Sequence, residues 1–237
     1  MLVSALVDNI QYTLADKGVY RTDTFVLSTI NHGQKLVAVL SMFDERRSSI
    51  SISGSRNMVS LPATMLVPIF IANTTSGNRV NPVRLNEMEF YSSEWEGVVE
   101  GADVEYYTVL NPHHDAEIEL WCVPIPTTGT VDLSIVGAYV PADLTATSTP
   151  RLPEAYQDLL YLYGCFAGFV SEPGRTQDAG REYGKFVARL NGFVASLRSR
   201  FPSGYLFRPQ PIEFNYEAVT RQQQKESQPK QEQANEG

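Results

Sequence analysis

The clearest cluster of side chains that could hold a metal ion is His113, His114 and Asp115, with Glu117 two residues further on. Adjacent side chains on an extended chain point to opposite sides, and the preceding Asn-Pro pair marks a turn. The sequence has no HxH or HExxH spacing, and no third histidine nearby completes a ligand set. We therefore predict a polar turn rather than a metal site, and we expect no metal or other cofactor.

Motifs for nucleophilic or phosphate chemistry are also missing from the sequence, which contains no GxSxG, P-loop or GxGxxG pattern. His32 is predicted to lie at a surface or an interface rather than to act as a base. The glutamates between residues 87 and 119 could include a glycosidase pair, because carboxylate separation is a property of the fold. An acidic surface explains them more simply, so we predict that the protein is not an enzyme.

The charges are unevenly distributed along the 237 residues, whose formal net charge is -8. Residues 51–150 are strongly acidic and residues 151–210 are basic, so only the latter could offer phosphates a cationic face. Within them Arg181, Lys185 and Arg189 recur at every fourth residue and line one side of a predicted helix. One interpretation is a solvated helix face; the other is a subunit-interface or DNA-facing role.

Two further patterns bear on location. The longest apolar run, 65–72, contains Pro68 and is far shorter than the ~20 residues that cross a bilayer. The start, MLVSALVDNI, lacks the basic residues and cleavage site of a signal peptide, so we expect that the protein functions without being secreted.

Cys122 and Cys165 lie in apolar runs without CxxC spacing and are predicted to be buried, reduced thiols.

Apolar residues first recur with a helical period. This spacing predicts one helix over the first dozen residues and a second that begins at a cap on Thr22 or Asp23, with Gly33 as its weak point. From residue 49 the period is two, which predicts strands at 49–53, 65–72, 104–110, 118–125 and 131–140. A short helical insertion is predicted at 87–95.

Helical periodicity returns after residue 150. Pro153 suits the first turn of a third helix, and a fourth is predicted over 176–200. Gly164 and Gly168 lie one turn apart on the third helix, so we expect another element to pack closely there. Beyond residue 220 the chain is too polar to fold alone, and we predict that it is disordered or ordered only by a partner.

These elements predict an α+β fold: a helical bundle of N- and C-terminal helices, with an inserted antiparallel β domain and an extended C-terminal arm. The predicted divisions are 1–45, the N-terminal helix pair; 46–149, the β-rich domain; 150–200, the C-terminal helices; and 201–237, the arm and tail. In the arm, large apolar side chains stand among prolines and are predicted to bind a partner. They are Phe207, Phe214 and Tyr216.

This order of elements resembles that of the head-to-tail adaptor (connector) proteins of short-tailed bacteriophages, the podovirus adaptors. Local segments carry the resemblance further, and they follow one another in the same order as in the family. They are 23–34 (DTFVLSTINHGQ), 60–62 (SLP), 118–126 (IELWCVPIP) and, most strongly, 150–160 (PRLPEAYQDLL). The resemblance covers roughly residues 1–205, and none of its segments is a catalytic signature.

The resemblance implies a structural virion protein of the head-tail junction, or neck. In such a protein a homo-oligomeric ring of twelve copies lies under the portal, and the C-terminal arm docks on the portal protein. Below, the ring receives the tail nozzle or next tail protein; genomic DNA passes through it during ejection without sequence-specific binding. No membrane is involved, and assembly takes place in the host cytoplasm.

Two other functions stay open at this point. The chain could be another ring component of the tail, either a tail-completion or a tail-tube protein. A less favoured alternative is a β-sandwich carbohydrate hydrolase, which would need a concave polar site and a carboxylate with a shifted pKa.

Overall fold

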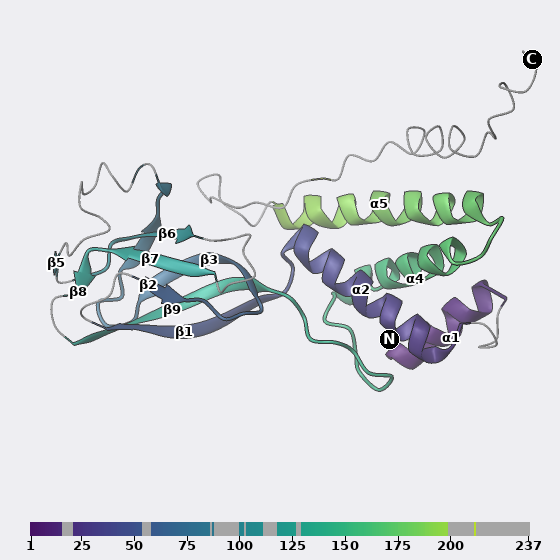
Figure 1. The fold of residues 1–237 in the computed structure, drawn as a ribbon, viewed down its shortest axis with the longest axis horizontal. Coiled ribbons are helices and arrows are strands. Elements are labelled where there is room, and N and C mark those ends of the chain that lie inside the picture. The colour runs from purple at the N-terminus through teal and green to yellow at the C-terminus, as the bar shows by residue number, and fades with distance from the viewer. Residues whose placement is uncertain are drawn as a thin grey trace, which may run out of the picture. The chain divides into compact units, whose positions relative to one another are not determined.

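The structure is a computed structural model that describes residues 1–15, 21–53, 58–85, 87, 100–101, 103–110, 118–126, 129–198 and 211 (Figure 1). Two compact units make up the described chain. The first takes its residues from Met1–Gly33 and Leu144–Ala195 and is helical, whereas the second takes most of them from Gln34–Asp143 and contains the main sheet. The predicted α+β class is therefore confirmed.

Helices of three turns or more account for most of the first unit. They are α1 (Val3–Thr13), α2 (Asp23–Ser41), α4 (Asp158–Val170) and α5 (Thr176–Arg198), with a single 3-10 turn (Glu154–Tyr156) directly before α4. The Thr22 hydroxyl oxygen accepts a hydrogen bond from the Phe25 N–H at 3.3 Å, so Thr22 is the cap of α2. Pro153 stays extended, because the third helix begins with the 3-10 turn rather than at the proline.

Helices α1 and α4 approach each other closely at the two glycines of α4. A Cβ at Gly164 would overlap Cδ1 of Ile10, and a Cβ at Gly168 would lie 2.8 Å from Cδ2 of Leu14. Both aliphatic side chains are buried, and they fill the space that the missing Cβ atoms leave. The prediction of close packing at these glycines is confirmed.

Aromatic rings join α4 to α5. Tyr163 lies 5.4 Å from Phe186 between ring centroids, and Phe166 lies 4.7 Å from Tyr183. Such tilted ring pairs stabilise the contact beyond the apolar area that the helices bury. Helix α4 therefore contacts α1 through glycines and α5 through aromatic side chains.

Gly33, predicted to be a weak point of α2, does not interrupt the helix. The helix runs without interruption through Gly33, which is buried. A Cβ at this position would lie 2.8 Å from Cδ1 of Tyr163, so the glycine lets the tyrosine ring pack directly on the backbone of α2.

The turn between α1 and α2 is held by polar side chains. The Gln11 side-chain amide donates to the Arg21 carbonyl at 3.1 Å and to the Asp23 carboxylate at 2.9 Å. The Arg21 guanidinium, only 10% exposed, donates to the Ser171 hydroxyl and pairs with Glu172 at 3.1 Å. A nearly buried arginine needs such partners, since an unpaired buried charge is costly.

Seven strands of the second unit form one sheet, in the order β1-β9-β3-β4-β6-β7-β2, and two short strands form a separate pair. Their bounds are β1 (Glu45–Ser53), β2 (Met58–Ser60), β3 (Met65–Asn73), β4 (Arg79–Pro82), β5 (Glu100–Gly101), β6 (Tyr106–Leu110), β7 (Glu119–Val123), β8 (Ile125–Pro126) and β9 (Thr130–Tyr139). The buried face gathers a core that includes Ile52, Ile71, Leu120, Leu133 and Ile135.

The longest ladder joins β1 to β9 over nine antiparallel residue pairs, from Glu45–Ala138 to Ser53–Thr130. On β1 the side chains alternate between the two faces, so that Ile52 is buried while Ser51 and Ser53 are exposed. The alternation predicted from the Ser-Ile-Ser-Ile-Ser segment is confirmed.

The expectation of an antiparallel β domain needs correction, because the sheet is mixed. Strand β4 pairs in parallel with β6, with Asn81 opposite Tyr106 and Pro82 opposite Tyr107. A parallel pair requires a long crossover, and residues 83–105 provide that length. The short strands β2, β4 and β5 were not predicted; of the helical insertion predicted at 87–95, only residue 87 lies among the described residues.

Amide side chains of α2 bind the segment that follows the sheet. In the first unit, the Asn31 amide donates to the Leu144 carbonyl at 3.2 Å and accepts from the Leu144 N–H at 2.7 Å. In the second unit, the Gln34 amide donates to the Ala142 carbonyl, and Lys35 pairs with Asp143 at 2.6 Å. No described helix is both long and apolar enough to span a membrane.

The close approach at Gly164 yields a stability prediction. Gly164→Leu should lower the free energy of unfolding by about 1–3 kcal/mol, because extra atoms at a filled site force the helices apart. The measurement is the urea midpoint of the purified protein.

The matched control is Gly184→Leu on α5, where an added Cβ would meet no atom within 4 Å. There the higher helix propensity of leucine should leave stability unchanged or raise it by up to about 1 kcal/mol. Equal loss in both variants would contradict the packing described for α1 and α4.

Candidate interaction surfaces

Several residues singled out by the sequence fall outside the described residues. Among them are the cluster at 113–117 and the aromatic side chains of the arm, Phe207, Phe214 and Tyr216. Within the described part of the chain, no three His, Cys, Asp or Glu side chains come together as metal ligands.

Two of the described glutamates of the acidic middle third have structural contacts. Glu119 accepts a hydrogen bond from the Trp121 indole at 3.1 Å, and Glu87 accepts one from the Arg84 N–H at 3.0 Å. Glu105 is exposed.

Both cysteines are buried thiols, as predicted. Burial raises the pKa of the Cys165 thiol to about 11, although a hydrogen bond with Tyr161 lowers it somewhat. Burial alone raises the pKa of Cys122 even further. Both groups are therefore protonated at neutral pH and lack the thiolate that nucleophilic chemistry requires.

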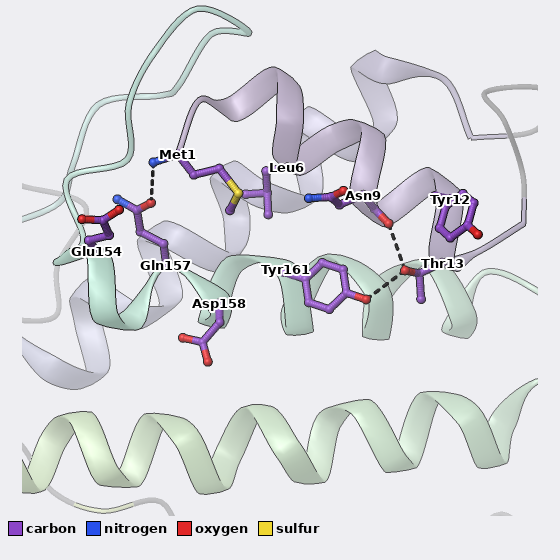
Figure 2. Close-up of a pocket in the computed structure, with 9 residues that line it drawn as sticks. All are labelled: Met1, Leu6, Asn9, Tyr12, Thr13, Glu154, Gln157, Asp158 and Tyr161. Atoms are coloured by element: carbon purple, nitrogen blue, oxygen red, sulfur yellow. Dashed lines mark hydrogen bonds between the residues drawn. The ribbon is translucent and has the colours of Figure 1, made fainter.

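A groove of about 550 Å³ lies between α1 and the start of α4 (Figure 2). At one end the N-terminal ammonium of Met1 donates to the side-chain carbonyl of Gln157 at 3.0 Å. Toward the other end, the hydroxyls of Thr13 and Tyr161 lie 2.8 Å apart. The lining combines apolar side chains with carboxylates, as in a protein-binding surface. It consists of Met1, Leu6, Asn9, Tyr12, Thr13, Glu154, Gln157, Asp158 and Tyr161.

The basic residues predicted on the fourth helix do line one side of α5, and each has an acidic partner. Arg181 lies 3.0 Å from Asp178, and Lys185 lies 2.8 Å from Glu182. Arg189 reaches across to α4, where it pairs with Asp158 at 2.8 Å and also donates to the Ala155 carbonyl.

Arg181 and Lys185 are the more exposed members of their pairs. The side chains of Arg181 and Lys185 are 60% and 54% exposed, whereas that of Glu182 is only 8% exposed beneath them. The Arg175 guanidinium lowers the pKa of the Asp178 carboxyl, so this carboxylate remains ionised and keeps the pairs intact. The exposed edge of this side of α5 is therefore cationic.

Apolar side chains at α1 are also exposed, on the side of the helix away from its buried stripe. The Tyr12 ring is 82% exposed at the end of the groove, and Leu2 just before the helix is 54% exposed. Both residues lie outside the apolar stripe of α1 that packs on α4, so the helical periodicity of the sequence already indicated that they are exposed. The groove itself could not be found in the sequence, because its two walls lie more than a hundred residues apart.

The helical unit thus exposes apolar side chains at α1 and cationic side chains on α5. Residues 1–207 match the family model described as SU10 adaptor protein. The chain belongs to this family of phage head-to-tail adaptors. It is accordingly a structural adaptor protein of the virion neck. No curated protein matches the chain.

Thiol reactivity tests the description of the cysteines. At pH 8 an aromatic disulfide reagent should modify both thiols of the native protein at least about tenfold more slowly than those of the urea-unfolded chain, because burial keeps them protonated. Fast reaction of one native thiol would show that one of these sites is open and ionised.

The basic side of α5 yields a second prediction. Arg181→Ala and Lys185→Ala should each change the free energy of unfolding by less than about 1 kcal/mol, since exposed ion pairs contribute little. Chemical denaturation measures this change. A larger loss would mean that the side chains are needed for the fold, and would remove the case for a role in binding.

Proposed function

We propose that the chain forms a ring of twelve copies under the portal, joins it to the tail nozzle or the next tail protein, and lines the passage for genomic DNA. The observation that carries this proposal is the family match over residues 1–207, which spans both described units. A structural role without catalysis, cofactor or membrane agrees with the inert thiols and with the structural contacts of the glutamates.

The helical unit supports assembly into a ring. A ring is built from one heterologous contact repeated between identical subunits, so each subunit must offer two different faces. The first unit exposes an apolar face with Tyr12 on α1 and a cationic face with Arg181 and Lys185 on α5.

For the portal, we propose the C-terminal arm as the docking element. Phe207, Phe214 and Tyr216 are large apolar groups on a segment too rich in proline for a helix, and such side chains are frequent anchors in the pockets of partners. Phe207 is the last residue of the family match, whereas the other two lie beyond it.

The charge distribution supports passage of DNA without sequence-specific binding. A protein that grips phosphates needs a concentrated cationic surface, but residues 51–150 are acidic. The basic side of α5 formed by Arg181, Lys185 and Arg189 is proposed to face a neighbouring subunit or the DNA. Assembly would take place in the host cytoplasm, before the neck is complete.

The test is assembly on purified portal rings, followed by native mass measurement. The full chain should add the mass of twelve copies, whereas a chain truncated after Phe201 should fail to join. A full-length triple variant, Phe207→Ser with Phe214→Ser and Tyr216→Ser, separates loss of the anchors from loss of length.

If the truncated chain joins portal rings as tightly as the full chain, the arm is not the docking element. If the full chain forms rings but associates with the tail tube instead of the portal, it is another ring component of the tail.

A further inference from the structure

We propose that, in the ring, the outward face of α1 in one copy packs against the outward face of α5 in the next copy; this inference rests on the proposed ring. The α1 face consists of Leu2, Ala5, Asp8 and Tyr12, all exposed. The α5 face consists of Arg181, Gly184, Lys185, Ala188 and Gly192, also all exposed.

The two faces point away from each other within the helical unit. Helix α4 lies between α1 and α5 (Figure 1). Helix α1 uses Ile10 and Leu14 against α4, while α5 uses Phe186 and its neighbours, so both helices turn their other sides outward. A contact between opposite faces of identical subunits is head-to-tail, and it repeats around a ring instead of closing on a dimer.

The shapes of the faces are complementary. Tyr12 projects from α1 with 82% of its surface exposed, and no described residue forms a hydrogen bond or ring contact with its side chain. On α5, an added Cβ at Gly184 or Gly192 would meet no atom within 4 Å. The α5 face is thus flat enough for an aromatic ring to lie against the helix backbone.

The charges of the faces are complementary as well. Asp8 is the sole charged residue of α1 and is exposed. Arg181 and Lys185 hold their cationic groups outermost on α5, with the carboxylate of Glu182 buried beneath them. Contact between these faces brings opposite charges together at the rim of an apolar centre, and such charges steer and orient association.

Cysteine crosslinking identifies the contact directly. The double variant Ala5→Cys with Ala188→Cys, which keeps Tyr12, should, on mild oxidation of portal-bound rings, give a ladder of covalent oligomers on a denaturing gel. The native thiols are buried and give little background. The matched control, Ala5→Cys with Ser49→Cys on the exposed side of β1, should remain monomeric under the same conditions.

A second variant tests the contact without cysteine chemistry. Gly184→Leu adds bulk to the α5 face, where the isolated subunit has open space, so it should fold normally and yet reduce ring formation at least tenfold. Ser28→Leu, at an exposed position of α2, should leave ring formation unchanged.

The outcomes separate this contact from the proposed ring. Rings that form normally with Gly184→Leu, or a double-cysteine variant that gives no ladder, overturn the contact and leave the ring intact. Equal loss with Ser28→Leu also overturns it, because the effect is then not specific to α5. A wild-type chain that forms no ring on the portal overturns the proposed function itself.

Discussion

The helical unit depends on the absence of side chains at Gly164 and Gly168 of α4. Ile10 and Leu14 of α1 occupy the space that Cβ atoms would otherwise fill, so two helices with little surface area still bury their apolar stripes. This contact fixes the position of α1, which in turn forms one wall of the groove and directs Tyr12 outward. The packing of α1 on α4 and the surface that α1 exposes thus depend on two glycines.

The ion pairs of the helical unit combine stability with an exposed charge. From Arg21 at the start of α2 they continue through Glu172 and Arg175 to Asp178 on α5. Glu172 and Asp178 each contact two cations, and on α5 the cations of Arg181 and Lys185 are more exposed than the carboxylates they pair with. These ion pairs stabilise the turn between α4 and α5. They also leave cationic groups exposed, where a partner protein can contact them.

Periodicity in the sequence predicted the features that depend only on the directions of successive side chains along one element. The stripe of α1 and the alternation around Ile52 were found because each side chain's direction follows from local geometry. The parallel pairing of β4 could not be predicted, since Arg79–Pro82 is too short to show a period and its partner is distant. The packing role of Gly33 could not be predicted, because it depends on the ring of Tyr163, which is distant in the sequence. Likewise, the basic side of α5 was visible in the sequence, whereas the groove depends on tertiary structure.

The polar contacts at the two ends of the second unit bear on how the sequence of this protein can change in evolution. Gln34 is bonded to Ala142 and Lys35 to Asp143, so the chain enters and leaves that unit at neighbouring points. An insertion whose ends meet in this way behaves as a cassette: another module with the same end spacing, joined to α2 at residue 34, can replace it while the first part of α2 and helices α1 and α4 stay unchanged. Viruses that exchange tails could thus alter one part of their neck protein by recombination and retain the rest.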